Sequence, residues 1–136
     1  MYRDEQYIKA ISGMDKVSLQ PGGGTQAIFA NVETIRAYHE SRGEGEQRNE
    51  IITTILSHPG NPGAAATLGY KVITLYPRWK TVMPDIEALK AAVSEHTAAL
   101  MITNPEDTGI YNEKIKEICR YCSMQLEAYA YMTRQT

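Results

Sequence analysis

The chain has 136 residues, a usual length for one domain with one hydrophobic core. Its net charge of −2 is spread over interspersed acidic and basic residues, and this excludes the basic patch or stripe that a nucleic-acid partner requires. No apolar run approaches the roughly 20 residues that span a bilayer, and the charged start lacks the apolar stretch of a signal peptide. We therefore expect no membrane partner and a cytoplasmic location, or a mitochondrial matrix location in a eukaryote.

The first third of the chain predicts an arm and one long helix. Residues 1–12 are mostly polar with a few apolar residues at helical spacing, so we expect a short helix or arm ahead of an α/β domain over 13–136. The glycines at 22–24 break the chain, and Thr25 is the expected N-cap of a helix that Gly43 ends. The expected apolar face of this helix consists of Phe29, Val32, Ile35, Ala37 and Tyr38.

Strands and helices alternate over the rest of the chain. We expect strands at 51–56, 72–75, 98–103 and, in the tail, 126–131, with helices at 64–68, 84–93 and 111–123. This alternation predicts βαβ units, a mostly parallel sheet and flanking helices. The run 98–103 is nearly all apolar, as in a sheet that is covered on both faces. Ligands of such sheets lie at the carboxyl ends of the strands.

Three loops fall at such positions. Glycines just before a long helix suit an anion, because the first turn offers unpaired N–H groups and a positive dipole end; the alternative is a plain flexible turn. The spacing fits neither a Walker A loop nor a dinucleotide fingerprint. His58 either lies against a flat cofactor ring or transfers protons, or it only satisfies local hydrogen bonds. Asn104 either points at a ligand or simply ends its strand.

The two cysteines match a C-x-x-C spacing, but their place argues against redox chemistry. Cys119 and Cys122 fall late in a predicted helix, where the dipole opposes a thiolate. A zinc site would need two more ligands, and the three histidines are scattered without ligand spacing. We expect two core thiols on one helix face, no metal site and no catalytic triad or pair of carboxylates.

Five stretches taken in order carry a family resemblance. They are residues 13–21, 35–45, 57–62, 69–72 and 98–105. Together they resemble the glycine decarboxylase P-protein of the glycine cleavage system, in particular its C-terminal half or second subunit. The resemblance implies part of the large domain of a fold-type-I transferase that depends on pyridoxal phosphate (PLP). It also implies an oxidoreductase of glycine catabolism, which decarboxylates glycine and passes the aminomethyl group to a lipoyl H-protein.

The resemblance implies a set of cofactor-binding residues. They are Gly24, Thr25, Gln26, His58, Asn61 and Asn104. The first three fall on the family's phosphate-binding turn, the histidine falls on one that lies against the cofactor ring, and the asparagines fall in two Asn-Pro segments near the site. The implied partners are the other P-protein subunit, the H-protein and glycine. Because a partial domain exposes strand edges and apolar surface, we also expect an oligomer.

Several positions depart from the family. Glycine stands at 23 where another small residue is usual, Ile28 stands for a glutamate, and Pro59-Gly60 stand for Gly-Thr. Met132 falls where the family's aspartate pairs with the pyridine nitrogen, which would weaken the electron sink.

The family's Schiff-base lysine lies in a segment beyond this sequence, so we expect no catalytic residue here and no activity of this chain alone. The alternatives are a non-catalytic interaction module, a relic that binds a phosphate ligand, or an independent phosphate-ligand binder of flavodoxin-like or Rossmann-like type.

Overall fold

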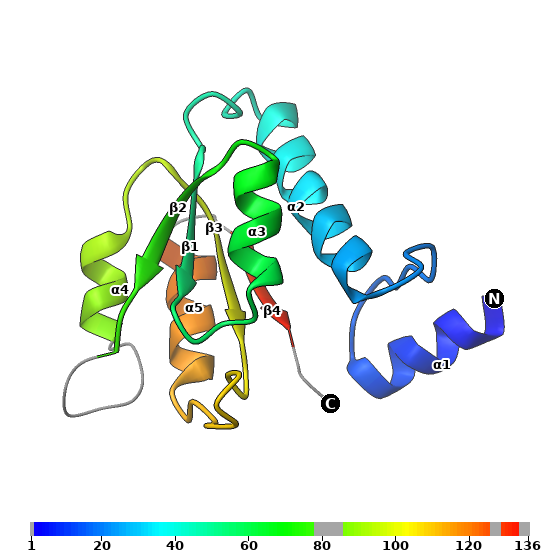
Figure 1. Ribbon diagram of the computed structural model, residues 1–136. Coiled ribbons are helices and arrows are strands. Elements are labelled where there is room, and N and C mark those ends of the chain that lie inside the picture. Colours follow the sequence, from blue (N-terminus) through cyan, green and yellow to red (C-terminus); the bar gives the residue numbers. More distant parts are fainter. Residues whose placement is uncertain (1, 78–85, 126–128, 134–136) are drawn as a thin grey trace.

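The fold is an α/β arrangement around one parallel sheet (Figure 1). The computed structural model describes residues 2–77, 86–125 and 129–133. The elements in chain order are α1 (Tyr2–Ser12), α2 (Gly24–Ser41), β1 (Glu50–Thr54), α3 (Gly60–Thr67), β2 (Lys71–Leu75), α4 (Ile86–Ala92), β3 (Thr97–Thr103), α5 (Ile115–Gln125) and β4 (Tyr129–Thr133). In this described part the strand order is β2-β1-β3-β4, and each neighbouring pair is parallel. The predicted parallel sheet with flanking helices is therefore confirmed.

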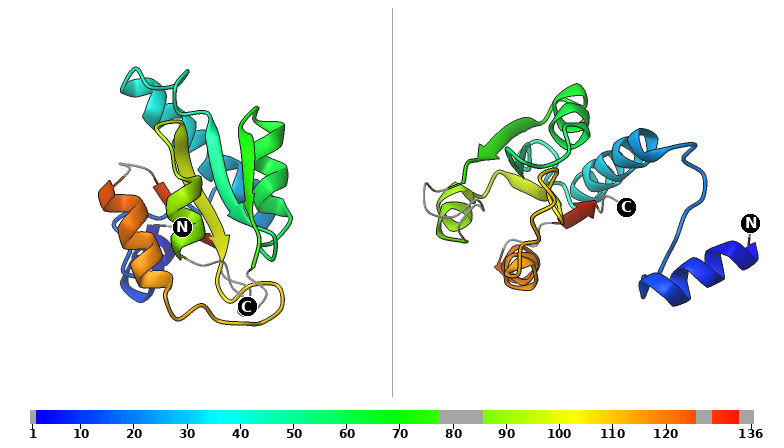
Figure 2. Two further views of the ribbon diagram at one scale, coloured as in Figure 1. Left: turned by 90° about the vertical axis from the view of Figure 1, so that its left-hand side faces the viewer. Right: turned by 60° about the horizontal axis from the view of Figure 1, so that its bottom comes forward.

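The helices cover the sheet on both sides. Helices α2 and α3 lie on one face, and α4 and α5 lie on the other (Figures 1 and 2). Successive residues of a strand point to opposite faces, so Ile51 joins the α2–α3 core while its neighbour Ile52 joins the α4–α5 core. Every residue of β1 and β3 is buried, whereas Lys71 at the start of β2 is exposed. Burial on both faces explains why the predicted run at 98–103 is continuously apolar.

The order of the strands creates a switch point. The chain leaves β1 toward β2 at one edge, and from β2 it crosses to β3 on the other side of β1. The carboxyl ends of β1 and β3 therefore lie side by side while their connections diverge. In open α/β sheets this is where ligands bind. The N-terminal end of α2 lies at the same end of the sheet (Figure 1).

Two helices begin elsewhere than the sequence predicted. Helix α2 begins at Gly24, with Gly23 as an N-cap that makes no side-chain bond, so the prediction of Thr25 as N-cap is wrong. Helix α3 begins at Gly60, four residues before the predicted 64–68, because Pro59 already has helical dihedrals and its carbonyl accepts the Gly63 N–H at 3.1 Å.

Other boundaries shift less. Helix α5 begins at Ile115 rather than at 111. The tail strand β4 covers Tyr129–Thr133, somewhat later than the predicted 126–131. The start of the helix predicted at 84–93 and part of the loop before it lie outside the described residues. The prediction that Gly43 ends α2 is confirmed, since this residue has a φ of +75° just after the helix.

The apolar face of α2 also differs from the predicted one. The buried residues are Ile28, Val32, Ile35 and His39. This spacing follows the helical period, and it leaves Ala37 exposed and Phe29 only partly buried. The sequence did not predict that His39 would be buried, because a histidine was not counted as part of an apolar face.

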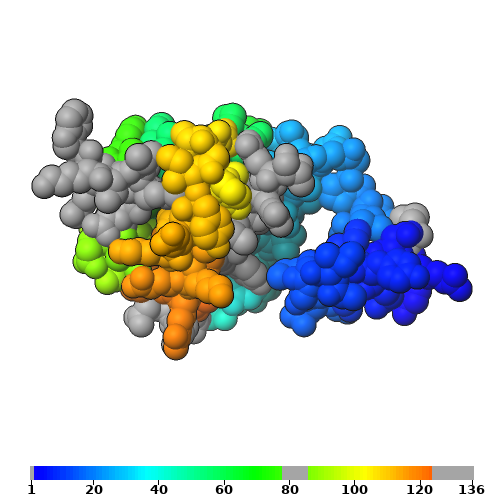
Figure 3. Space-filling view, turned by 90° about the horizontal axis from the view of Figure 1, so that it is seen from below, coloured from blue at the N-terminus to red at the C-terminus, as the bar shows by residue number. Residues whose placement is uncertain are grey.

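Helix α1 stands away from the sheet (Figures 2 and 3). It has no buried residue, and Tyr2 and Ile11 are 74% and 86% exposed. Gly13 ends it with a φ of +72° and donates its N–H to the Lys9 carbonyl at 2.9 Å. The division into an arm over 1–12 and a domain over 13–136 stays a prediction. None of the described helices is long and apolar enough to cross a membrane.

Candidate functional site at the carboxyl ends of the strands

The first part of the site is the open start of α2. Gly24, Thr25 and Gln26 are all exposed, and the first backbone bond of the helix is the one from the Ala27 N–H to the Gly23 carbonyl at 3.0 Å. The N–H groups of the three residues before Ala27 have no acceptor among the described residues. Such free groups at the positive end of an 18-residue helix suit an anion.

The glycine turn before α2 is crossed by one flexible side chain. The Oε1 atom of Gln26 lies 3.2 Å from the place that a Cβ at Gly22 would occupy and 3.3 Å from that of a Cβ at Gly23. The φ of Gly23 is −175°, an extended conformation that any residue adopts, so its backbone does not require glycine. The small turn instead leaves the helix start accessible once the Gln26 side chain moves.

The second part is a hydrogen-bond network that joins the turn after β1 to the end of β3. The hydroxyl of Thr103 accepts the backbone N–H of His58 at 3.0 Å and bonds the Ser57 hydroxyl at 3.1 Å. The Nδ2 atom of Asn61 donates to Ser57 Oγ at 2.7 Å and to Thr103 Oγ1 at 3.4 Å. Asn61 is fully buried, and its Oδ1 has no partner in the described structure. The network fixes the backbone at the switch point.

The His58 ring stands beside the start of α2. It is partly buried, and its Nδ1 accepts the Gly60 N–H at 3.0 Å. A Cβ added at Gly60 would lie 2.9 Å from His58 Nδ1 and 3.0 Å from Ile28 Cδ1. Because Ile28 belongs to the second turn of α2, the imidazole and the helix start share one neighbourhood. The isoleucine that replaces the family's glutamate is a buried core residue here.

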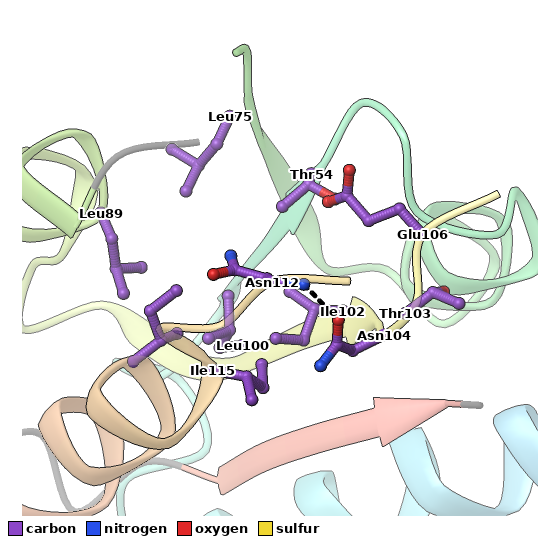
Figure 4. A pocket seen from close by; sticks show the side chains of 11 residues that line it. Thr54, Leu75, Leu89, Leu100, Ile102, Thr103, Asn104, Glu106, Asn112 and Ile115 are labelled. Carbon is purple, nitrogen blue, oxygen red and sulfur yellow. Dashed lines mark hydrogen bonds between the residues drawn. The ribbon is translucent and has the colours of Figure 1, made fainter. Parts of the chain in front are cut away.

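The third part is a small pocket on the α4–α5 side of the same strand ends (Figure 4). Its volume is about 20 Å³, room for about one water molecule. Asn104 lines it and accepts the Asn112 N–H on Oδ1 at 2.9 Å. The peptide bond between Asn104 and Pro105 is cis.

The pocket contains a buried acid that the sequence analysis missed. Glu106 is only 4% exposed; its Oε1 accepts the Thr54 hydroxyl at 2.8 Å, and its Oε2 has no partner among the described residues. Burial raises the pKa of this carboxyl, the Thr54 hydrogen bond lowers it, and nearby Asp107 raises it further. In the sequence, the only signal for Glu106 was its position two residues after Asn104, which directly follows β3.

The remaining candidates lie elsewhere. Cys119 and Cys122 are free thiols on α5 that pack into the α4–α5 core, as predicted. Burial raises the pKa of Cys122 to about 12, so it stays a thiol. The described residues contain no group of three or more His, Cys, Asp or Glu placed to hold a metal ion. Met132 lies in β4 opposite Ile102 of β3, and its equivalence to the family's aspartate stays a prediction.

Comparison with known proteins agrees with this geometry. Residues 5–126 match the model of the DegT/DnrJ/EryC1/StrS aminotransferase family. A probable glycine dehydrogenase (decarboxylating) subunit 2 from Pyrococcus abyssi is 46% identical over 120 residues, which are 88% of this chain and 24% of that protein. A protein of the same name from Thermus thermophilus is 39% identical over 122 residues, 90% of this chain and 26% of that protein. The chain thus spans about a quarter of the length of these relatives.

Solved structures share the fold. An inhibitor-bound glycine decarboxylase (P-protein) of the glycine cleavage system aligns over 98% of this chain and 28% of its own, with a TM-score of 0.71 and 16% identity. An aspartate aminotransferase of Thermus thermophilus aligns over 95% and 35%, with a TM-score of 0.70 and 18% identity. At such identities the likeness concerns the fold alone.

These findings confirm the resemblance to glycine decarboxylase and the fold-type-I architecture. The cofactor that this architecture implies is pyridoxal phosphate. Since the family model covers nearly the whole chain, the protein belongs to the DegT/DnrJ/EryC1/StrS aminotransferase family.

Proposed function

We propose that this chain forms the phosphate and ring side of a PLP site in a P-protein of the glycine cleavage type. The substrate of that enzyme is glycine, and its partners are the second P-protein subunit and a lipoyl H-protein. The observation that carries the proposal is the contact of Ile28, in the second turn of α2, with the turn at Gly60 that holds the His58 ring. The helix that packs against this turn has three free N–H groups at its start. A switch point with these groups suits a phosphorylated planar cofactor.

The residues present fit such a group on two sides. The N–H groups of Gly24, Thr25 and Gln26, together with the exposed Thr25 hydroxyl, would hold the phosphate. His58 and the Nδ2 atom of Asn104 would orient the ring. When bound, PLP supplies an electron sink for the carbanion left by decarboxylation, and the protein supplies orientation and electrostatics. Asn61 would not contact the cofactor, and its bond to Ser57 Oγ holds the turn that carries His58.

The fit stops at two points. By the resemblance, Met132 stands where the family's aspartate pairs with the protonated pyridine nitrogen, and a thioether has no negative charge to stabilise that nitrogen. Lys71 and Lys90 are engaged in ion pairs with Glu50 and Glu87 at 2.7 and 2.8 Å. We therefore expect this chain to bind PLP without forming a covalent bond to it.

A titration of the purified chain with PLP, followed by borohydride reduction and mass analysis, tests this function. We expect saturable binding and an unchanged protein mass after reduction. A stoichiometric adduct on one lysine would contradict the expected inactivity, and an absence of binding would contradict the proposal itself.

The Gly24 backbone offers a matched pair of variants for this titration. Proline at the first helical position removes the N–H and keeps the helix, and the extended Gly23 before it tolerates proline. Gly24→Pro should therefore weaken PLP binding about tenfold, the value of one hydrogen bond to a charged group. Gly24→Ala keeps the N–H and meets nothing within 4 Å, so its affinity should match that of the unaltered chain.

We also propose that the chain self-associates or pairs with a partner subunit. Tyr76, Tyr111, Ile110 and Ile55 are 67%, 56%, 38% and 47% exposed, and all four follow strands at the carboxyl end of the sheet. Exposed apolar side chains that gather near a site favour an interface there. Sedimentation at increasing concentration should give a rising average mass, and a constant monomer mass would contradict the expectation.

A further inference from the structure

The His58 ring is held in one orientation from two sides. We propose that Thr103 and Gly60 are positioning residues that keep the neutral ring as its Nε2–H tautomer, so that it presents a hydrogen-bond donor to the ligand. The proposal deepens the function proposed above and depends on it only in taking the bound ligand to be PLP.

Thr103 fixes the backbone of His58. Its hydroxyl accepts the His58 N–H at 3.0 Å, and the residue is only 2% exposed. Ser57 and Asn61 bond to the same oxygen at 3.1 and 3.4 Å, so the hydroxyl itself has little freedom. A buried N–H that loses its acceptor is costly, and the turn can therefore adopt few other conformations.

Gly60 fixes the ring. Its N–H donates to His58 Nδ1 at 3.0 Å, and a neutral imidazole carries its single proton on the nitrogen that is not accepting. The proton therefore lies on Nε2. The absence of a Cβ matters equally, because a Cβ at Gly60 would lie 2.9 Å from Nδ1 and would push the ring away. Proline at 59 has no N–H, so it offers no competing donor in the turn.

The atom that remains is Nε2. It has no hydrogen-bond partner in the part of the chain that the structure describes, and the ring is partly exposed beside the start of α2. Both polar features of this corner, the helix N–H groups and the Nε2–H, are thus donors. A ligand that bears acceptor atoms on both its phosphate and its ring, as PLP does, satisfies them together.

The chain contains its own references for the tautomer. It has three histidines. His96 Nδ1 faces the Gln47 carbonyl at 3.0 Å, so its proton lies on Nδ1, the opposite of His58. His39 Nε2 faces the Ala98 carbonyl at 3.0 Å, and its Nδ1 lies 3.4 Å from Glu44 Oε2, so both of its nitrogens face acceptors. Single substitutions assign the signals of the three rings, and His96 is the reference for the tautomer opposite to that of His58.

The experiment is ¹⁵N NMR of the imidazole rings of the full 136-residue chain without ligand, at about pH 8.5, where an ordinary imidazole is neutral. His58 should give a pyridine-type Nδ1 and a pyrrole-type Nε2, the reverse of His96. The reversed pattern at His58, or averaged signals, would overturn the proposal.

Variants test the two positioning residues. Thr103→Val should average the two His58 nitrogen signals, and Thr103→Ser should restore them. Gly60→Ala, at a position where helix α3 tolerates alanine, should also average them while the His39 and His96 signals stay unchanged. If Thr103→Val does not fold, the serine and Gly60 variants still decide. Unchanged His58 signals in Gly60→Ala would show that Gly60 does not set the ring.

A PLP titration of the same variants separates this proposal from the proposed function. Gly60→Ala should raise the dissociation constant of PLP about three- to tenfold, the range expected for one hydrogen bond. If the unaltered chain binds no PLP but shows the expected tautomer, the proposed function fails and the positioning stands. If PLP binds equally to all variants, the Nε2–H makes no contribution to the ligand, and that part of the proposal is wrong.

Discussion

Among the described residues, the polar groups at the amino ends of the strands are paired, whereas several at the carboxyl ends are not. At the amino ends every charged group discussed above is paired: Glu50 accepts from Lys71 at 2.7 Å and from the Ser94 hydroxyl at 3.1 Å. His39 reaches the Ala98 carbonyl, and Arg48 donates to the Thr97 carbonyl at 3.0 Å. These bonds tie α2 and the loop after it to the starts of the strands.

At the carboxyl ends, polar groups are buried and left without partners. The buried side-chain atoms that lack a partner among the described residues are Thr53 Oγ1, Asn61 Oδ1 and Glu106 Oε2, and all three lie near these ends. The free N–H groups of α2 lie at the same end. Unsatisfied buried groups cost stability, and they are retained where a ligand or catalytic role uses them. The amino ends therefore stabilise the fold, and the unpaired groups at the carboxyl ends support the proposal that the ligand binds there.

The largest expected effect that tests this comparison lies at the amino ends. His39→Ala should lower the free energy of unfolding by about 3 kcal/mol, because it leaves a cavity under a ring that is 1% exposed and removes the donor to the Ala98 carbonyl. Urea unfolding monitored by circular dichroism measures the loss.

His96→Ala is the matched control for this change. The ring of His96 is 48% exposed and also bonds a carbonyl, but it fills no core space, so its loss should cost less than about 1 kcal/mol. Equal losses for the two variants would show that burial of His39 does not stabilise the amino ends.

The next effect concerns pH and has opposite signs at the two ends. The Lys71 hydrogen bond holds the pKa of Glu50 below its ordinary value, so the stability it contributes is present above that value and is lost as pH falls through the lowered pKa. Burial raises the pKa of Glu106, so its contribution is present below the ordinary value and is lost as pH rises through the raised pKa.

Glutamine variants at these two positions should separate the two signs. At neutral pH, Glu50→Gln should destabilise by about 0.5 to 1 kcal/mol, a small value because the Lys71 partner is 68% exposed. Glu106→Gln should stabilise by on the order of 1 kcal/mol, because it removes the cost of ionising a buried carboxyl and keeps an acceptor for Thr54. Unfolding curves between about pH 4 and pH 8 check both. The same sign for both variants would contradict the contrast.

The sequence predicted the parallel sheet and the breaks between its elements, because these depend on local pattern. The fully buried strand at 98–103 is a continuous apolar run, and the breaks at Gly13 and Gly43 have the positive φ that favours glycine. Local pattern therefore fixes these elements. Strand–helix alternation predicts a parallel sheet with ligands at the carboxyl ends of its strands, which is why the turns at His58 and Asn104 were candidates. The strand order that creates the switch point is seen only in the structure.

The sequence was insufficient where long-range contacts decide. The role of Thr103 depends on an N–H that lies 45 residues earlier, and the bond between Thr54 and Glu106 spans 52 residues. Nothing in a local window marks such pairs. The early start of α3 also escaped prediction, because Gly-Asn-Pro-Gly is typical of a loop. The Gly63 N–H bond to the Pro59 carbonyl and the buried Asn61 side chain hold it in a helix.

The smallest expected effect tests whether the Gln26 side chain, at the start of α2, contributes to ligand binding or only to the fold. Gln26 is exposed, and its side chain crosses the glycine turn, where no hydrogen bond from the described residues holds it. Gln26→Ala should therefore change the free energy of unfolding by less than about 0.5 kcal/mol. PLP affinity should fall about threefold if the amide contributes one neutral hydrogen bond to the ligand.

Isothermal titration of the two chains with PLP, and then with inorganic phosphate, reads this effect. A similar loss for both ligands would place the Gln26 amide at the phosphate, whereas a loss for PLP alone would place it nearer the ring. Tighter binding by the variant would mean that the side chain covers the helix start and must move aside for a ligand. Gln26 would then control access to the start of α2 and would not bind the ligand. At the start of α2, the binding groups would then be the backbone N–H groups alone.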